Sequence, residues 1–205
     1  NYYNLHEDKV KVIYFSSDFE IEHNKTKTLQ NHILYVGSRS NYKNFEKFIE
    51  SFSLSEKLKK DFNLIIFGGE NSSLNGLNIL KKYNIKKNKF KFINGTNNDL
   101  KYYYKNVRLF IYPSRYEGFG IPLVESMRMG CPIISSNGGA LKEIAGDGIT
   151  YFDPDSVEDI KFKLESTIYD DTKLTNTINY GYERSKKFSW KNCAKETYDT
   201  YESLL

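Results

Sequence analysis

From residue 32 onward, the hydrophobic positions of this chain fall into two alternating patterns. Short apolar runs rich in β-forming residues are followed by stretches in which apolar residues recur at helical spacing. A parallel strand covered on both faces is a nearly continuous apolar run, whereas a surface helix has a period of about 3.6 residues. The pattern therefore predicts strands that alternate with helices. The predicted strands are 32–36, 62–67, 90–93, 107–112, 132–135 and 150–152.

Helical spacing fills the intervals between these strands and continues to the end of the chain. The predicted helices are 44–58, 74–83, 99–105, 121–129, 140–145, 156–169, 172–187 and 189–205. Six alternations predict an α/β fold, a Rossmann-like parallel sheet of about six strands flanked by helices. In such a sheet a ligand binds at the C-terminal ends of the strands. The last helix has Ser189 as a plausible N-cap and carries an apolar stripe at Trp190, Ala194, Tyr198, Tyr201 and Leu205.

The first 31 residues do not share this pattern. Residues 9–15 alternate like a strand, whereas residues 16–31 are polar and have no clear period. We interpret this region as a connector and residues 32–205 as one domain.

Composition limits the functional classes without selecting one. The 205 residues are 39% hydrophobic and 27% charged, with a net charge of +4, as in an ordinary globular domain. The lysines are dispersed, so nucleic-acid binding has no support, while a weak attraction to anionic lipid is permitted. No apolar run approaches the roughly 18 residues of a membrane helix, and the first residues do not resemble a signal peptide. Two cysteines indicate a reducing compartment, and Cys131 is expected to be buried.

Residues 112–126 carry the strongest functional signal. They follow a predicted strand, and Gly118 and Gly120 allow a sharp turn before a helix with Pro122 in its first turn. The free N–H groups at such a helix start favour an anion. Glu117 and Glu125 flank this anion site, and sugar hydroxyls would give both acids partners. Alternatively, Glu117 is a capping acid and Glu125 a solvated acid that complements the helix dipole.

The loop after the first strand of the alternation, residues 37–44, contains two cations. Arg39 offers a planar set of donors suited to phosphate oxygens, and Lys43 offers a mobile point charge. Each cation alone is better explained as solvated. Their shared position at the sheet edge of Glu117 favours a phosphate clamp. Gly37 belongs to neither a dinucleotide-binding fingerprint nor a Walker loop.

Several other motifs have simpler explanations. Gly138 and Gly139 either bring N–H groups near an anion or form a turn. The D-x-D pattern at 153–155 precedes a helix, so capping is favoured over metal binding. The three histidines are scattered, which gives no metal-ligand cluster. The tyrosines at 102–104 are expected to pack a helix on the sheet rather than to stack on bases.

Taken together, these segments resemble a known family. The stretch 117–125 (EGFGIPLVE) is similar to the E-x7-E signature of retaining glycosyltransferases with the GT-B fold, most closely family 4. Residues 37–45 resemble that family's phosphate-binding loop, and 135–147 and 151–154 resemble further blocks in the same order. The similarity covers the chain from about residue 33 to its end. It departs from the family where Ser38 precedes Arg39 and where Gly138 and Gly139 replace small polar residues.

The resemblance implies the C-terminal, donor-binding half of a two-domain enzyme, with residues 1–31 as the tail of the acceptor-binding domain and the linker. The donor would be a nucleotide-diphosphate sugar, and no metal or other cofactor is implied. Arg39 and Lys43 would hold the diphosphate, Glu117 the sugar and Glu125 the ribose. Beside these, the implied donor-binding residues are Gly37, Phe92 and Ile93 near the nucleobase, and Gly118, Phe119, Gly120 and Ile121 in the loop and helix start.

The resemblance thus implies a hexosyltransferase domain that needs its missing half for transfer, in glycan or glycoconjugate biosynthesis. The acceptor, a glycan or lipid-linked molecule, would bind through that half. The expected location is cytoplasmic, with peripheral contact to the membrane. Two alternatives stay open: a nucleotide-sugar epimerase of the same fold, and a non-catalytic nucleotide-binding or interaction module.

Overall fold

The computed structural model describes residues 6, 9–22, 30–39, 41–69 and 74–204. The strands of this part are β1 (Gln30–Val36), β2 (Asn63–Phe67), β3 (Phe90–Ile93), β4 (Val107–Tyr112), β5 (Ile133–Ser136) and β6 (Thr150–Phe152). The α-helices are α1 (Phe45–Ser53), α2 (Glu56–Asp61), α3 (Leu74–Lys82), α4 (Asn97–Asn106), α5 (Ile121–Arg128), α6 (Leu141–Ala145), α7 (Val157–Ile168), α8 (Asp171–Ser185) and α9 (Trp190–Glu202). Two 3-10 turns, η2 (Asn41–Lys43) and η3 (Lys87–Lys89), precede α1 and β3.

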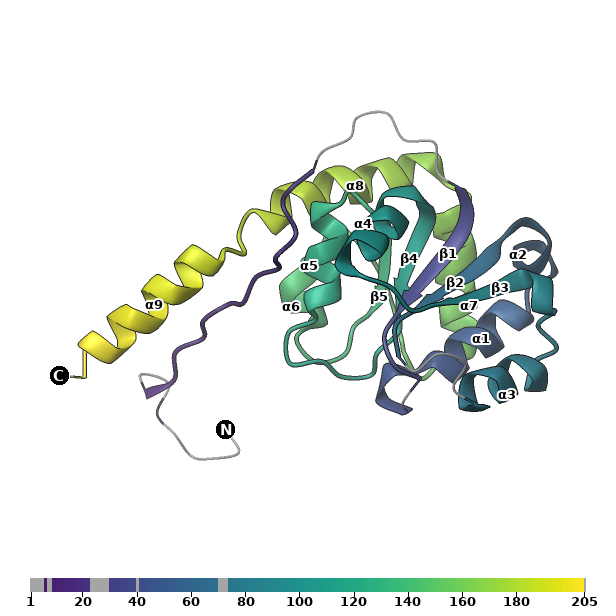
Figure 1. Cartoon of the computed structure of the whole chain (residues 1–205), viewed down its shortest axis with the longest axis horizontal. Coiled ribbons are helices and arrows are strands. Elements are labelled where there is room, and N and C mark those ends of the chain that lie inside the picture. The colour runs from purple at the N-terminus through teal and green to yellow at the C-terminus, as the bar shows by residue number, and fades with distance from the viewer. Residues whose placement is uncertain (1–5, 7–8, 23–29, 40, 70–73, 205) are drawn as a thin grey trace.

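The strands form one parallel sheet in the order β3-β2-β1-β4-β5-β6. Leu34 at the centre of β1 lies opposite Ile65 of β2 and Phe110 of β4. The strand order reverses between β1 and β4, and a ligand crevice opens at the carboxyl ends of strands at such a switch point. This architecture, seen in Figure 1, confirms the predicted Rossmann-like α/β fold.

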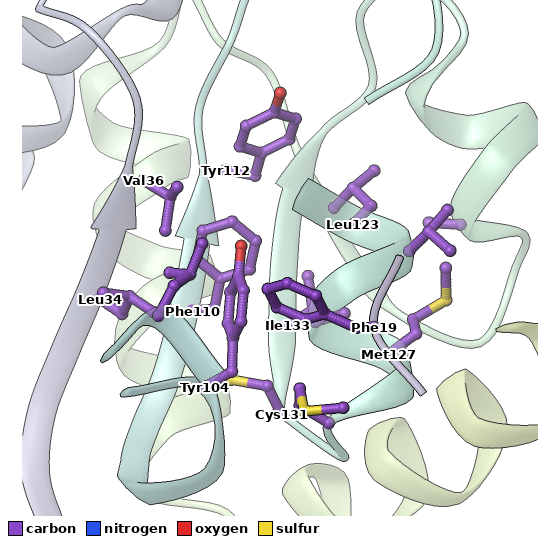
Figure 2. Packing of buried hydrophobic residues seen from close by; sticks show 14 of the residues in the cluster. Phe19, Leu34, Val36, Tyr104, Phe110, Tyr112, Leu123, Met127, Cys131 and Ile133 are labelled. Atoms are coloured by element: carbon purple, nitrogen blue, oxygen red, sulfur yellow. The ribbon is translucent and has the colours of Figure 1, made fainter. Parts of the chain in front are cut away.

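The core has two layers because successive side chains of a strand point to opposite faces of the sheet. In β1, Ile33 and Tyr35 join a cluster that α1, α2, α3 and α7 cover. Leu34 and Val36 join the opposite cluster, which α4, α5 and α6 cover. Phe19, from the segment before β1, also lies in this second cluster, against Tyr104 and close to α5 (Figure 2). The segment 16–19 is therefore packed onto the domain.

The structure corrects the predicted elements in four places. Residues 10–15 form no strand, because a strand needs a neighbour for its backbone hydrogen bonds and these residues pair with none of the described strands. β1 begins at Gln30, earlier than predicted. The first helix is divided, because the Ser55 side chain accepts from Leu58 N and starts a second helix. In α9, Ser189 is the predicted N-cap, but Trp190, Tyr198 and Tyr201 of the predicted apolar stripe are exposed. Leu205, the last residue of that stripe, lies outside the described residues.

Candidate active site

The loop after β1 is shaped by its backbone and by a buried tyrosine. Gly37 has a φ of 135°, which lets the chain turn away from the sheet, and its N–H donates to Phe67 O at 2.9 Å. The hydroxyl of Tyr35 donates to Ser38 O at 2.5 Å and lies 3.5 Å from Lys43 O. These contacts hold the ends of the loop together. As a result, Lys43 emerges at the carboxyl edge of β1.

The loop after β4 turns at Gly120, which has a φ of 91° and is the N-cap of α5. A Cβ at Gly120 would lie 2.8 Å from the Leu141 side chain, so both conformation and space call for glycine there. Pro122 lies in the first turn of the helix, as predicted. Gly118, in contrast, is exposed and has no atom within 4 Å of its would-be Cβ. Space is therefore open beside Gly118, at the start of α5.

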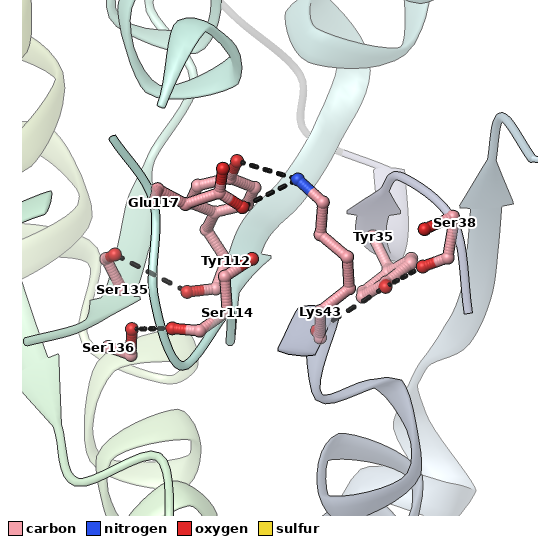
Figure 3. Close-up of polar contacts among 8 residues, drawn as sticks. All are labelled: Tyr35, Ser38, Lys43, Tyr112, Ser114, Glu117, Ser135 and Ser136. Atoms are coloured by element: carbon pink, nitrogen blue, oxygen red, sulfur yellow. Dashed lines mark hydrogen bonds and ion pairs between the residues drawn. The ribbon is translucent and has the colours of Figure 1, made fainter. Parts of the chain in front are cut away.

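Lys43 and Glu117 meet where these two loops face each other (Figure 3). Lys43 Nζ lies 2.6 Å from Glu117 Oε1, and the two side chains are 15% and 14% exposed. The ammonium also donates to the Tyr112 hydroxyl at 3.4 Å. Burial raises the pKa of Tyr112, so its hydroxyl stays neutral and accepts this bond. Residues from both sides of the switch point thus form one polar cluster.

Arg39 is buried at 7% exposure and faces β2 and β3 rather than β4. Its Nη1 donates to Gly68 O at 2.5 Å, and its guanidinium lies 4.9 Å from the centre of the Phe92 ring. Gly69 is needed for this packing, since a Cβ there would lie 1.9 Å from Nη1. Burial lowers the pKa of Arg39 from its ordinary value. Arg39 Nε is buried and finds no partner in the described structure, which marks it as a donor that a ligand could satisfy.

The two residues predicted to border the nucleobase point to different faces of β3. Phe92 packs with the α1 side of the core and stacks on Arg39, whereas Ile93 packs with the opposite cluster. The carbonyl of Ile93 accepts from Gly68 N at 2.9 Å. Arg39 and Phe92 therefore form a second group of predicted residues, separate from the Lys43–Glu117 pair.

Glu125 lies in the second turn of α5 and is partly buried, which contradicts its interpretation as a solvated surface acid. Tyr104 OH donates to Glu125 Oε2 at 3.3 Å. Burial raises the pKa of Glu125 to about 6, while the hydrogen bond from Tyr104 lowers it and the charge of Asp18 raises it. Near neutral pH, keeping the ionised Glu125 carboxylate partly buried lowers the free energy of unfolding. Acids held at such a cost are typical of functional sites.

Gly138 and Gly139 hold the Glu117 loop in place, a role that sequence reasoning missed. A Cβ at Gly138 would lie 2.0 Å from Arg115 O, and Gly139 has a φ of 59° with Glu117 O 2.6 Å from its would-be Cβ. Ala140 N donates to Glu117 O at 3.0 Å. These contacts favour the turn interpretation of the two glycines. The paired glycines after a strand were the available signal, but their partner loop is distant in sequence.

The D-x-D pattern behaves as its simpler explanation predicts. Asp159 N donates to Ser156 Oγ at 3.1 Å, and Asp153 N donates to Asp159 Oδ2 at 2.8 Å, so the D-x-D pattern serves capping. Of the tyrosines at 102–104, Tyr104 is fully buried on the sheet and Tyr103 packs partly against it, whereas Tyr102 is exposed. Cys131 is buried as predicted. Among the described residues, no three His, Cys, Asp or Glu side chains lie close enough to hold a metal ion. No helix in the described ranges is long and apolar enough to cross a membrane.

A hollow of about 430 Å³ adjoins Arg39 on the α1 side. Its lining is polar and includes Asn44, Lys47 and Arg115 but neither Lys43 nor Glu117. The Lys43–Glu117 ion pair therefore does not line this hollow.

Comparison with known proteins assigns the family. The family model described as glycosyl transferases group 1 matches residues 16–184. The chain belongs to this family. This assignment agrees with the GT-B resemblance of the sequence and with the six-stranded sheet.

Curated relatives of this domain include O-antigen mannosyltransferases. The O-antigen chain mannosyltransferase B of Escherichia coli is 30% identical over 177 residues, which cover 85% of this chain and 46% of that protein. The O-antigen chain mannosyltransferase RfbU of Salmonella typhimurium is 34% identical over 158 residues, covering 75% of this chain and 42% of that protein. The chain thus spans less than half the length of either relative.

Solved structures show the same fold. The C-terminal domain of a glycosyl transferase group 1 family protein (LpcC) from Francisella tularensis matches with a TM-score of 0.66 at 22% identity, covering 85% of this chain and 95% of that one. Anabaena Alr3699/HepE, solved in complex with UDP and glucose, matches with a TM-score of 0.72 at 17% identity, covering 84% of this chain and 48% of that one. The described domain therefore has the fold of about half of the Anabaena chain and of nearly the whole Francisella domain.

Proposed function

We propose that this chain is the donor-binding half of a retaining, family 4-like hexosyltransferase that uses a nucleotide-diphosphate sugar. The observation that carries the proposal is the meeting of Lys43 and Glu117 at the sheet's switch point, beside the open space at Gly118. A cation, an acid and a helix start converge there, which suits a ligand with a diphosphate next to a hydroxyl-rich ring. The mannosyltransferase names of the relatives and the UDP and glucose in the Anabaena structure support this ligand class.

Lys43 is suited to bind the diphosphate without leaving Glu117. An ammonium has three donors, and Glu117 and Tyr112 occupy two of them. The third remains for a phosphate oxygen, to which the backbone N–H groups at Gly118–Ile121 would add further donors. Glu117, held by Lys43, would accept from hydroxyls of the sugar. Lys43 would thus hold the Glu117 carboxylate in position and also neutralise part of the diphosphate charge.

Arg39 and Glu125 would bind a phosphate and the ribose of the nucleoside diphosphate, respectively. The unpaired Nε of Arg39 is a donor for a phosphate oxygen, and the Phe92 ring beneath it, with Ile93, would border the nucleobase. Glu125 would accept from the ribose hydroxyls. Its raised pKa fits this role, because a ligand hydroxyl compensates a buried carboxylate that otherwise has Tyr104 as its hydrogen-bond donor.

The proposed transfer depends on stabilising the charges that form when the donor's sugar–phosphate bond breaks. Breaking the bond between the sugar and the phosphate leaves negative charge on the diphosphate and a cation-like ring. Lys43, Arg39 and the N–H groups of α5 would stabilise the departing diphosphate, and losing one such preorganised donor typically costs about 3 kcal/mol in the barrier. Glu117 would favour the positive ring through its charge. No metal is required in this scheme, and no residue is assigned as a covalent nucleophile.

The whole enzyme would place this domain opposite an acceptor-binding half, of which residues before β1 are the tail. We propose a role in glycan or glycoconjugate assembly, which the O-antigen mannosyltransferase names of two relatives support. We also propose that the enzyme acts at the cytoplasmic side of a membrane. The acceptor would enter from the half that lies outside this chain.

Calorimetric titration with UDP-, GDP- and ADP-sugars tests the donor site. One class should bind, and Lys43→Ala should weaken its affinity by about 100-fold, because a phosphate loses its ammonium partner. Lys186→Ala is the matched control, since Lys186 is an exposed cation paired with Glu183 on α8. If no nucleotide sugar binds, or if Arg39→Ala and Glu125→Ala leave binding unchanged, the proposal fails and a non-catalytic interaction module becomes the better explanation.

A further inference from the structure

Two segments far apart in sequence leave the domain at the same place. Residues 9–15 and helix α9 run side by side away from the sheet (Figure 1), and Lys11 Nζ lies 3.5 Å from Glu196 O. The segments reach the domain at Ser16–Phe19 and at Phe188–Trp190. There, Trp190 Nε1 donates to Asp18 Oδ1 at 2.9 Å. Both segments therefore meet one small area of the domain surface, on α5.

The guanidinium of Arg128, at the end of α5, binds both segments. Its Nη1 donates to Ser17 O and Phe19 O at 2.6 Å each, and its Nη2 donates to Ser16 Oγ at 2.9 Å and to Phe188 O at 2.6 Å. Four bonds from one side chain hold two segments that lie about 170 residues apart in the chain. Arginine suits this role because its planar donors have a fixed geometry. Lysine could make only some of these bonds.

An aromatic cluster joins the same segments to the loop that carries Glu117. The Phe119 ring lies 5.6 Å from Phe15 and 5.6 Å from Phe188, measured between ring centres. Tyr14 lies 6.4 Å from Phe119, and Phe15 lies 6.2 Å from Trp190. The side chain of Phe119 therefore packs against the two segments, while its neighbours Glu117 and Gly118 face the candidate site.

The segments also contact α4 through Phe19 and Tyr104, and α6 through Tyr14 and Glu143. The Arg128 and Phe119 contacts, however, reach the helix and loop that carry Glu125, Glu117 and Gly118. Asp18, bound to Trp190, is also close enough to Glu125 for its charge to raise the pKa of that acid. The donor-site elements and the two segments thus share one set of packed groups.

We propose that Arg128 and Phe119 are positioning residues that couple the donor site to the paired segments 14–19 and 188–190. This inference rests on the proposed donor function. Binding of a nucleotide diphosphate would move the Glu117–Gly120 loop and, through the Phe119 ring, shift Phe15, which packs on Trp190. Coupling is reciprocal, so the arrangement of the two segments, and of whatever they connect to, would in turn change the affinity for donor.

Trp190 is the single tryptophan of the chain and lies inside this cluster, so it reports the coupling directly. We would titrate the chain with UDP, GDP and ADP and follow binding by calorimetry and indole emission in parallel. Free N-acetyltryptophanamide corrects for absorption by the nucleotide. A nucleotide that binds should change Trp190 emission with the same dissociation constant that calorimetry gives.

Variants separate coupling from binding. Arg128→Met and Phe15→Leu, the latter between the Phe119 and Trp190 rings, should reduce the emission change by about fivefold, while the calorimetric dissociation constant stays within about threefold. Arg128→Lys should restore part of the response. Circular dichroism verifies that each variant is folded, and Phe15→Leu remains informative if Arg128→Met does not fold. The Lys186→Ala variant should behave as the unaltered chain.

The outcomes are distinguishable. Binding without any emission change, or an emission change that survives in both folded variants, overturns the coupling and leaves the donor site intact. Absence of calorimetric binding by all three nucleotides overturns the donor site and the coupling with it. Loss of the emission change with unaltered affinity supports the positioning role.

Discussion

The loop after β4 has two sides that are built very differently. On its front, Glu117 forms an ion pair with Lys43 and Gly118 faces open space. On its back, Phe119 lies in an aromatic cluster and the backbone of Arg115 and Glu117 touches Gly138 and Gly139. The front has spare hydrogen-bonding capacity and room, whereas the back is filled. A binding loop needs both, because a ligand gains most from groups that are already held in place.

The largest expected effect on stability comes from adding a methyl group at the filled back of this loop. Gly138→Ala places a methyl group 2.0 Å from Arg115 O, so backbone must move, and we expect a loss of about 3 kcal/mol in the free energy of unfolding. Urea unfolding followed by circular dichroism measures this loss.

Gly118→Ala is the matched variant on the front of the loop. No atom lies within 4 Å of the added methyl group, so the free energy of unfolding should change by less than about 0.5 kcal/mol. The affinity for donor should fall, however, because the methyl group occupies space proposed for the ligand. Equal stability losses in Gly118→Ala and Gly138→Ala would contradict the distinction between an open front and a filled back.

An effect of intermediate size on the free energy of unfolding is expected at Glu125, which lies behind the loop on α5. Its folded-state pKa of about 6 exceeds the ordinary value of 4.5, so the folded state binds more protons than the unfolded state between these values. The group's contribution to stability is therefore fully present below pH 4.5 and is lost as the pH rises through about 6. Glu125→Gln, which keeps an acceptor for Tyr104, should gain about 1–2 kcal/mol near neutral pH.

Unfolding measured across this pH range tests the expectation. The stability difference between Glu125→Gln and the unaltered chain should shrink as the pH falls through the window. Donor affinity should decrease in the same variant, because an amide is a weaker acceptor than a carboxylate for ribose hydroxyls. A stability difference that does not vary with pH would show that burial of the charge is not its cause.

The smallest effect tests how the back of the loop is held. Tyr14 OH donates to Glu143 Oε1 at 2.6 Å near the surface, while its ring contacts Phe119 and Phe188. Tyr14→Phe keeps the ring and should cost about 0.5 kcal/mol in thermal or urea unfolding. Tyr198→Phe removes a comparable exposed bond to Glu202 on α9, away from the loop. A much larger loss in Tyr14→Phe than in Tyr198→Phe would mean that the bond, rather than the rings, holds the cluster.

Much of the fold could be predicted because its signals are local. Apolar runs such as those of β1 and β4 and the helical spacing of Phe45, Phe48 and Phe52 depend on neighbouring residues, and the structure confirms them. The strand-like alternation in residues 9–15 was equally clear, yet residues 10–15 form no strand. A strand depends on a partner, which periodicity does not supply.

The site was predicted in part for the same reason. The sequence placed Lys43 and Glu117 after strands of a parallel sheet, and carboxyl ends of parallel strands share one edge. Nothing in the sequence indicated that the two form an ion pair, or that Arg39 turns toward Gly68 and Phe92. Side-chain direction depends on the packing around each loop, which is set by residues far away in the chain.

The sequence by itself therefore determined the order of strands and helices, the loops that carry the polar groups and the glycine turns at their ends. Only the tertiary structure decided that Gly138 supports the Glu117 loop, that Glu125 is partly buried and that Arg128 joins two distant segments. The physical reason is the separation along the chain between the residues that interact. Hydrogen bonding within an element and its periodicity are local, whereas burial, close approach and pairing across loops arise only when the sheet brings distant segments together.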